Sequence, residues 1–148
     1  MDEAVARGDQ RPTGLRVLVV DDPKGTAGMM RRLLMAHGCK AEIARNGAEA
    51  LELAHRLRPD VVLLDLTLPG LNGREAAAEL RRSEGLERTA LVAVASCDAD
   101  EPLAALFDGY FVKPVDIHAL LRFLARVAAG PAPVGTAPAP ERAGAGSS

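Results

Sequence analysis

Four charged side chains follow short apolar runs at three separate places in the sequence. Asp21 and Asp22 end one run, Asp65 ends a second, and Lys113 ends a third. Continuous apolar runs are typical of strands buried on both faces of a parallel sheet, and such sheets bind ligands at the carboxyl ends of their strands. If these strands are neighbours, the three carboxylates repel one another unless a hard cation such as Mg²⁺ lies between them. Lys113 then supplies a positive charge for a phosphoryl group.

Asp65 is the residue we expect to react. A carboxylate is a competent nucleophile for phosphoryl transfer and forms an aspartyl phosphate, while a metal ion and a lysine spread the charge of the transferred group. Asp65 leaves the most central run, Val61–Leu64, and the turn-forming loop 69–73 after it leaves room for a donor. Asp21 and Asp22 are better placed to hold the metal.

Five units of strand followed by helix account for most of the chain. Strands are expected at residues 16–20, 39–44, 61–64, 90–95 and 109–112, and apolar residues recur at helical spacing after each of them. The segment 98–107 has room for only two or three helical turns. The pattern predicts an α/β fold of the flavodoxin-like (βα)5 type, a three-layer sandwich with a parallel five-stranded sheet in the order 2-1-3-4-5 and a shortened fourth helix.

The overall composition limits the classes of function. The 148 residues, 48% hydrophobic and 26% charged with a net charge of -2, fit one soluble domain and give no electrostatic case for nucleic acid or a membrane surface. We expect a disordered leader at 1–14, a domain at 15–129 and a disordered Pro/Ala/Gly-rich tail at 130–148. Cys39 and Cys97 have no metal-ligand spacing, so we expect two reduced thiols. The cytoplasm is the expected location.

Three motifs together resemble the receiver domain of bacterial two-component response regulators. They are Val19-Val20-Asp21-Asp22, Leu63-Leu64-Asp65 with the loop to Gly73, and Val112-Lys113-Pro114. The resemblance extends over about residues 15–128. It implies a phosphoacceptor signalling domain, not an enzyme beyond its own phosphotransfer and self-dephosphorylation, that receives a phosphoryl group on Asp65 from the phosphohistidine of a kinase.

The resemblance also implies roles for individual residues and partners. Asp22 and Asp65 would bind Mg²⁺ directly, Asp21 through water, and Thr67 through its backbone carbonyl. Tyr110 matches an aromatic residue whose rotation reports phosphorylation. The expected partners are a histidine kinase, hybrid kinase or phosphotransfer protein and a downstream protein target; a homodimer stays open.

Two features depart from the family pattern. Members end the fourth strand with Ser or Thr, whose hydroxyl bonds the phosphoryl group, but an ungapped count from Asp65 places Ala95 there. We favour Ser96, one residue later, as the source of this hydroxyl. The interval from Ser96 to Lys113 is also short, which leaves the coupling to an output face open.

Two alternative functions therefore stay under consideration. An atypical receiver could act as a protein-interaction module that does not depend on phosphorylation. A haloacid-dehalogenase-type phosphatase also combines Asp, Lys and Mg²⁺, but it needs an acid two residues after the nucleophile, where this chain has Thr67.

Overall fold

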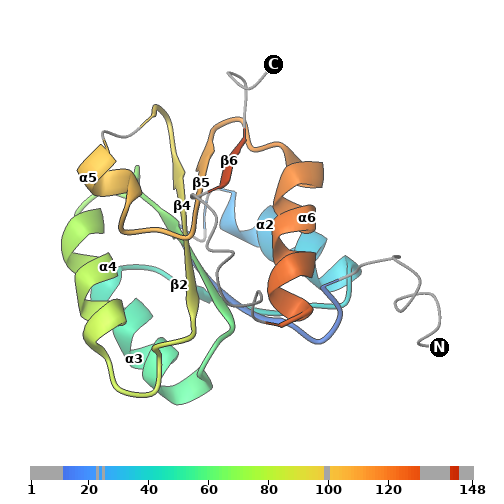
Figure 1. Ribbon diagram of the computed structural model, residues 1–148, viewed down its shortest axis with the longest axis horizontal. Helices are drawn as coiled ribbons and strands as arrows, with labels where there is room; N and C mark the ends of the chain where they lie inside the picture. The colour runs from blue at the N-terminus through green and yellow to red at the C-terminus, as the bar shows by residue number, and fades with distance from the viewer. Residues whose placement is uncertain (1–11, 23, 25, 99–100, 131–140, 144–148) are drawn as a thin grey trace.

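The computed structural model describes residues 12–22, 24, 26–98, 101–130 and 141–143. Its parallel strands form one sheet with helices on both faces (Figure 1). The strands are β1 (Arg16–Val20), β2 (Lys40–Ala44), β3 (Val61–Asp65), β4 (Ala90–Ala95), β5 (Gly109–Val112) and β6 (Glu141–Ala143). The helices are α2 (Ala27–Ala36), α3 (Gly47–Leu57), α4 (Gly73–Arg82), α5 (Glu101–Ala104) and α6 (Ile117–Ala128).

The sheet has the order β2-β1-β3-β4-β5-β6, so the predicted order 2-1-3-4-5 is confirmed for its first five strands. All five residues of β3 and all six of β4 are buried, which explains why both strands read as unbroken apolar runs. In the register, Val20 pairs with Leu64 and Asp65 pairs with Val94. The carboxyl ends of β1, β3 and β4 therefore lie side by side.

Each face of the sheet has its own hydrophobic core. Helices α2 and α6 cover one face, where Leu34, Leu120 and Leu124 pack on Val61 and Phe111. Helices α3, α4 and α5 cover the other face (Figure 1). Alternate residues of β1 and β3 point into opposite cores.

Local signals define the ends of the helices around the site. Asn46, Asn72 and Asp116 cap α3, α4 and α6, and each side chain accepts a backbone N–H three residues later. Helix α5 has only four residues, as the short interval in the sequence predicted.

The ends of the domain differ from our expectation. Glu141–Ala143, inside the expected disordered tail, form β6 and pair with Gly109–Phe111 of β5, because a sheet edge offers unpaired backbone groups. At the other end, the expected leader is ordered from Pro12, and the Gly14 N–H donates to the Gly38 carbonyl at 2.8 Å. The rest of both segments lies outside the described residues.

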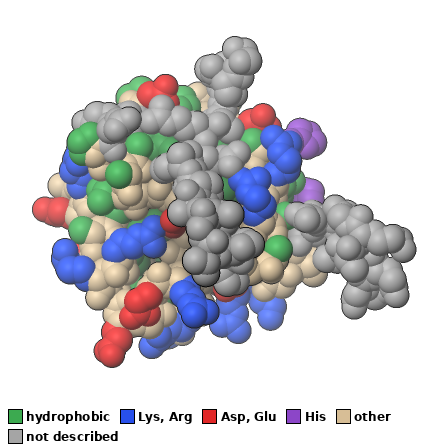
Figure 2. Space-filling model, in the orientation of Figure 1, with side chains coloured by type: hydrophobic (Ala, Val, Ile, Leu, Met, Phe, Trp, Pro, Cys, Tyr) green, Lys and Arg blue, Asp and Glu red, His purple; other side chains and the backbone are tan. Residues whose placement is uncertain are grey.

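None of the described helices has the length and apolarity that a membrane crossing needs. On the face drawn in Figure 2, acidic side chains lie among the lysines and arginines, so the basic residues form no uninterrupted patch there.

Candidate functional site

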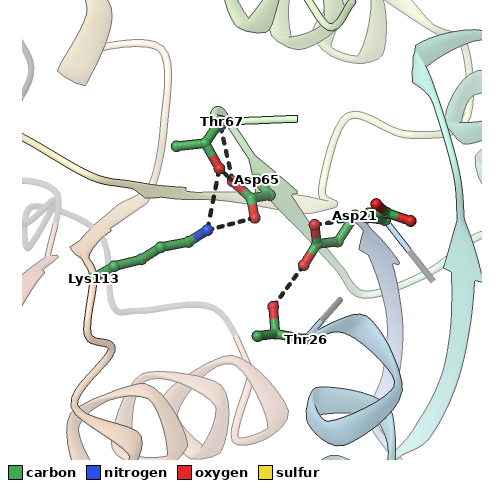
Figure 3. Close-up of polar contacts among 6 residues, drawn as sticks. Asp21, Thr26, Asp65, Thr67 and Lys113 are labelled. Carbon is green, nitrogen blue, oxygen red and sulfur yellow. Dashed lines mark hydrogen bonds and ion pairs between the residues drawn. The ribbon is translucent and has the colours of Figure 1, made fainter. Parts of the chain in front are cut away.

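Asp65 is the last residue of β3 and lies at the centre of the carboxyl edge of the sheet. Its side chain is only 7% exposed. The Leu66 N–H donates to the Val94 carbonyl at 2.8 Å, which continues the pairing with β4 past Asp65 and holds its backbone in place. The carboxylate therefore occupies a fixed position between β1 and the loop that follows β3 (Figure 3).

Lys113 and Thr67 bind the two oxygens of the Asp65 carboxylate. Lys113 Nζ donates to Asp65 Oδ2 at 2.8 Å, which confirms that Lys113 points toward this edge of the sheet. The Thr67 N–H and the Thr67 hydroxyl donate to Oδ1 at 2.8 and 2.6 Å. Lys113 Nζ also donates to Thr67 Oγ1 at 3.1 Å, so the three side chains are mutually connected (Figure 3).

These contacts keep the Asp65 carboxyl ionised. Burial alone would raise the pKa of Asp65, but the Lys113 ammonium, the Thr67 hydroxyl and the Thr67 N–H outweigh burial and hold the pKa below its usual range. An ionised carboxylate is the form that can act as a nucleophile or bind a cation.

Asp21 faces Asp65 from the end of β1. Its Oδ1 accepts the Asp22 N–H at 2.6 Å, and its Oδ2 accepts the Thr26 hydroxyl at 3.0 Å (Figure 3). Burial raises the pKa of Asp21, and the charge of Asp65 raises it further, although the Asp22 N–H and the Thr26 hydroxyl oppose the change. Asp21 and Asp65 therefore form a pair of carboxyl groups that repel each other when both are ionised.

Asp22 directly follows Asp21 at the end of β1, and its role in metal binding stays a prediction. The Asp22 side chain is exposed and accepts the Lys24 N–H at 2.9 Å, so its carboxylate stabilises its own loop. Within the described residues, no group of three or more His, Cys, Asp and Glu side chains is arranged to hold a metal ion. The closest pair of carboxyl groups is thus that of Asp21 and Asp65, while the Asp22 carboxylate accepts one local backbone N–H on Oδ1.

The remaining pair of carboxyl groups fits a small divalent cation. Mg²⁺ commonly uses one or two protein carboxylates and keeps several waters. Burial is the main cause of the raised pKa of Asp21, and the negative charge of Asp65 adds to it. A cation placed against both oxygens would remove that repulsion, so the donor set suits Mg²⁺.

Comparison with known proteins agrees with this geometry. The family model of the response regulator receiver domain matches residues 17–125. The chain belongs to the receiver domain family. A curated relative, the response regulator MprA of Mycobacterium sp. (strain KMS), is 40% identical over 110 residues, which is 72% of this chain and 47% of the relative. This receiver therefore spans about half the length of the curated relatives it matches.

Solved structures have the same fold. A CheY-like receiver domain from Methylobacillus flagellatus matches with a TM-score of 0.72 and 29% identity, over 78% of this chain and 99% of that one. The receiver domain of the sensor histidine kinase PA1611 from Pseudomonas aeruginosa PAO1 matches with a TM-score of 0.71 and 27% identity, over 80% and 100%. That structure has a magnesium ion coordinated in its active-site cleft.

The end of β4 is where this receiver departs from the family pattern. Ala95 is the last residue of β4, is 5% exposed and pairs with Val112, the residue before Lys113. Ser96 follows it and is exposed. Ala95, and not Ser96, therefore pairs with the last residue of β5, directly before Lys113. A role for the Ser96 hydroxyl at the site stays a prediction.

Tyr110 is buried and ties two elements together. Its side chain is 2% exposed, and its hydroxyl donates to the Cys97 carbonyl in the loop after β4 at 2.9 Å. Its ring also packs edge-on against Phe107 with centroids 6.4 Å apart. Tyr110 thus joins β5 to the loop that carries Ser96, and its role as a switch stays a prediction.

An apolar groove of about 600 Å³ opens beside the site. Met29, Met30 and Leu33 of α2 line one part of it, and Pro114, Val115 and Ile117 after Lys113 line another. Asp21, Asp65 and Lys113 also border it. Met29 is 68% exposed, which is unusual for a large apolar side chain beside a polar site.

The sequence did not indicate the side-chain role of Thr67 or the contribution of Thr26. Thr67 was expected to act through its backbone carbonyl, but its hydroxyl bonds both Asp65 and Lys113. A threonine two residues after a candidate nucleophile was the available signal. Thr26 had no comparable signal, because only the fold brings its hydroxyl to Asp21.

Proposed function

We propose that this receiver accepts a phosphoryl group on Asp65 from the phosphohistidine of a kinase or phosphotransfer protein, in a reaction that depends on Mg²⁺. An Asp65 carboxylate oxygen forms the new P–O bond. The P–N bond to the imidazole breaks, and its electron pair stays on the imidazole nitrogen, which then takes up a proton. In this proposal the domain is a phosphoacceptor in two-component signalling and not an enzyme with steady turnover.

The observation that carries the proposal is the state of Asp65. It is a buried carboxylate at the end of the central strand, it is held ionised by Lys113 and Thr67, and it faces a second carboxylate. Asp21, Asp22 and Asp65, with the backbone carbonyl of Thr67, would hold Mg²⁺, which when bound neutralises charge on the phosphoryl oxygens. Lys113 is within reach of the same oxygens once it leaves Oδ2.

The apolar groove supports the choice of a protein donor. A helix of the partner that carries the phosphohistidine could pack its apolar face on Met29 and Leu33, with the imidazole pointing toward Asp65. The chemistry requires a partner helix with an apolar face beside its phosphohistidine.

An intact-mass assay tests the proposal. Incubation with acetyl phosphate and MgCl₂ should add one phosphoryl group to the wild type and none to Asp65→Asn. Asp60→Asn is the matched control, because Asp60 flanks the opposite end of the same strand and accepts the Arg16 N–H at 2.9 Å. It should be phosphorylated like the wild type. A wild-type mass that stays unchanged with acetyl phosphate and with a phosphorylated kinase would overturn the proposal.

The alternative of an interaction module independent of phosphorylation is favoured by one observation, the alanine at the end of β4. It predicts that partner binding is equal for the wild type and Asp65→Asn. The phosphatase alternative lacks an acid beside Asp65, since the residue two positions later donates a hydroxyl to the carboxylate. Steady release of phosphate from a phosphate ester would be needed to support it.

A further inference from the structure

The Thr67 hydroxyl connects the nucleophile and the ammonium in one closed set of hydrogen bonds. It donates to Asp65 Oδ1 at 2.6 Å and accepts from Lys113 Nζ at 3.1 Å, while Lys113 Nζ donates to Asp65 Oδ2 at 2.8 Å. A hydroxyl has one donor and two acceptor lone pairs, so it can serve both neighbours at once. At position 67 an ionised carboxylate could not donate, and a methyl group could neither donate nor accept.

Each of these bonds restricts a different motion. Asp65 Oδ1 accepts both the N–H and the hydroxyl of Thr67, which fixes the rotation of the carboxylate and turns Oδ2 toward Lys113. The Lys113 side chain is 36% exposed and flexible, so a single ion pair would leave its ammonium free to move into solvent. The second acceptor on Thr67 keeps the ammonium beside Oδ2.

We propose that the Thr67 side chain is a positioning residue that holds Lys113 and the Asp65 carboxylate in the geometry for phosphoryl acceptance. This role is separate from the backbone carbonyl expected to bind the metal, because a substitution can remove the hydroxyl and keep the carbonyl. It rests on the proposed function for its effect on rate. Its effect on Lys113 is independent of that function.

The decisive comparison uses Thr67→Val, which keeps the β-branched shape and removes the hydroxyl, and Thr67→Ser, which restores the hydroxyl. Thr89→Val is the matched control. Thr89 is buried whereas Thr67 is exposed, but the Thr89 hydroxyl likewise makes a hydrogen bond, donating to the Pro59 carbonyl at 2.9 Å, away from the site. It reproduces the loss of one threonine hydrogen bond without touching Asp65 or Lys113.

The first measurement is the reactivity of the Lys113 amine in the absence of metal ions and of a phosphoryl donor. An amine-reactive ester, followed by peptide mass spectrometry, should label Lys113 roughly three- to tenfold faster in Thr67→Val than in the wild type, as expected for losing one hydrogen bond. The exposed Lys40 is the internal reference. Thr67→Ser and Thr89→Val should match the wild type.

The second measurement is the rate of Asp65 phosphorylation by acetyl phosphate at saturating Mg²⁺. We expect a roughly three- to tenfold lower rate constant in Thr67→Val, recovery in Thr67→Ser, and an unchanged dissociation constant for Mg²⁺. Wild-type labelling of Lys113 in Thr67→Val would overturn the inference. If the wild type itself took up no phosphoryl group, the proposed function would fail, and the labelling result would still decide the role of Thr67.

Discussion

Replacing Asp21 by Asn should stabilise the metal-free receiver and weaken its response to Mg²⁺. Burial and the charge of Asp65 raise the pKa of Asp21 above the usual 3.8, so the ionised form of Asp21 is disfavoured in the folded state relative to the unfolded chain. Ionised Asp21 therefore costs stability at neutral pH. Asn has nearly the same shape, can still accept the Asp22 N–H, and has no charge to repel Asp65.

The size of the effect follows from the surroundings of the pair. Two like charges near a protein surface can interact by several kcal/mol, but Asp21 is only half-buried and solvent screens much of this. We expect a gain of about 1 kcal/mol in the free energy of unfolding, or roughly 3–6 °C in Tm for a domain of this size. The gain should shrink as the pH falls toward the usual Asp range, because Asp21 is then neutral in the wild type too.

Magnesium should remove the advantage of the variant. At a concentration one hundred times its dissociation constant, a ligand adds about 2.7 kcal/mol to the stability of the wild type. If the variant binds Mg²⁺ about tenfold more weakly, it gains only about 1.4 kcal/mol at the same concentration. Thermal unfolding in EDTA and across an MgCl₂ series measures both effects.

Asp60→Asn is the control for this experiment, since it makes the same substitution at the opposite end of β3. It should give no gain in EDTA and should keep the wild-type response to Mg²⁺. The reasoning is refuted if Asp21→Asn is no more stable than the wild type in EDTA, or if Mg²⁺ raises the Tm of both proteins equally.

Two further predictions concern residues outside the site. Burial raises the pKa of Cys39 to about 11, so about one thousandth of this thiol is ionised at pH 8, and a disulfide reagent should modify the exposed Cys97 first. Equal rates for both thiols in the folded protein would contradict the burial of Cys39. Asp108 accepts the Arg81 guanidinium at 2.6 Å and a backbone N–H of β4 at 2.8 Å, so Asp108→Ala should lower the free energy of unfolding in urea by about 1–2 kcal/mol. Glu79→Ala, which removes an exposed ion pair, should change it by less than about 0.5 kcal/mol, and equal losses in the two variants would count against a special role for Asp108.

The strands of the domain could be predicted from the sequence because each is marked by a local run of apolar residues. The bounds of β1, β4 and β5 match the expected runs, and β3 is longer only by Asp65 itself. A parallel strand with both faces buried has to be apolar throughout, and a charge at its end marks the carboxyl edge. For the same reason Asp65 and Lys113 could be assigned to one edge before their contact was known.

The details that sequence reasoning missed all depend on contacts between distant or competing groups. The sequence did not indicate that the Asp22 carboxylate accepts the Lys24 N–H, because this bond depends on the conformation of the loop after β1. The pairing of β6 with β5 rests on backbone groups, which leave no side-chain pattern to read. The bond from Arg81 to Asp108 joins residues 27 positions apart and depends on how α4 packs.

The two facing carboxyl groups have different hydrogen-bond partners, and their pKa values are shifted in opposite directions. Each accepts a threonine hydroxyl and a backbone N–H, Asp21 from Thr26 and Asp22, and Asp65 from Thr67. Only Asp65 also has an ammonium, 2.8 Å away, and this difference lowers its pKa while that of Asp21 rises. The group that must attack is thereby kept ionised. The group opposite it keeps charge that a cation can relieve, and this asymmetry supports the proposal that Asp65 is the nucleophile and that Asp21 takes part in cation binding.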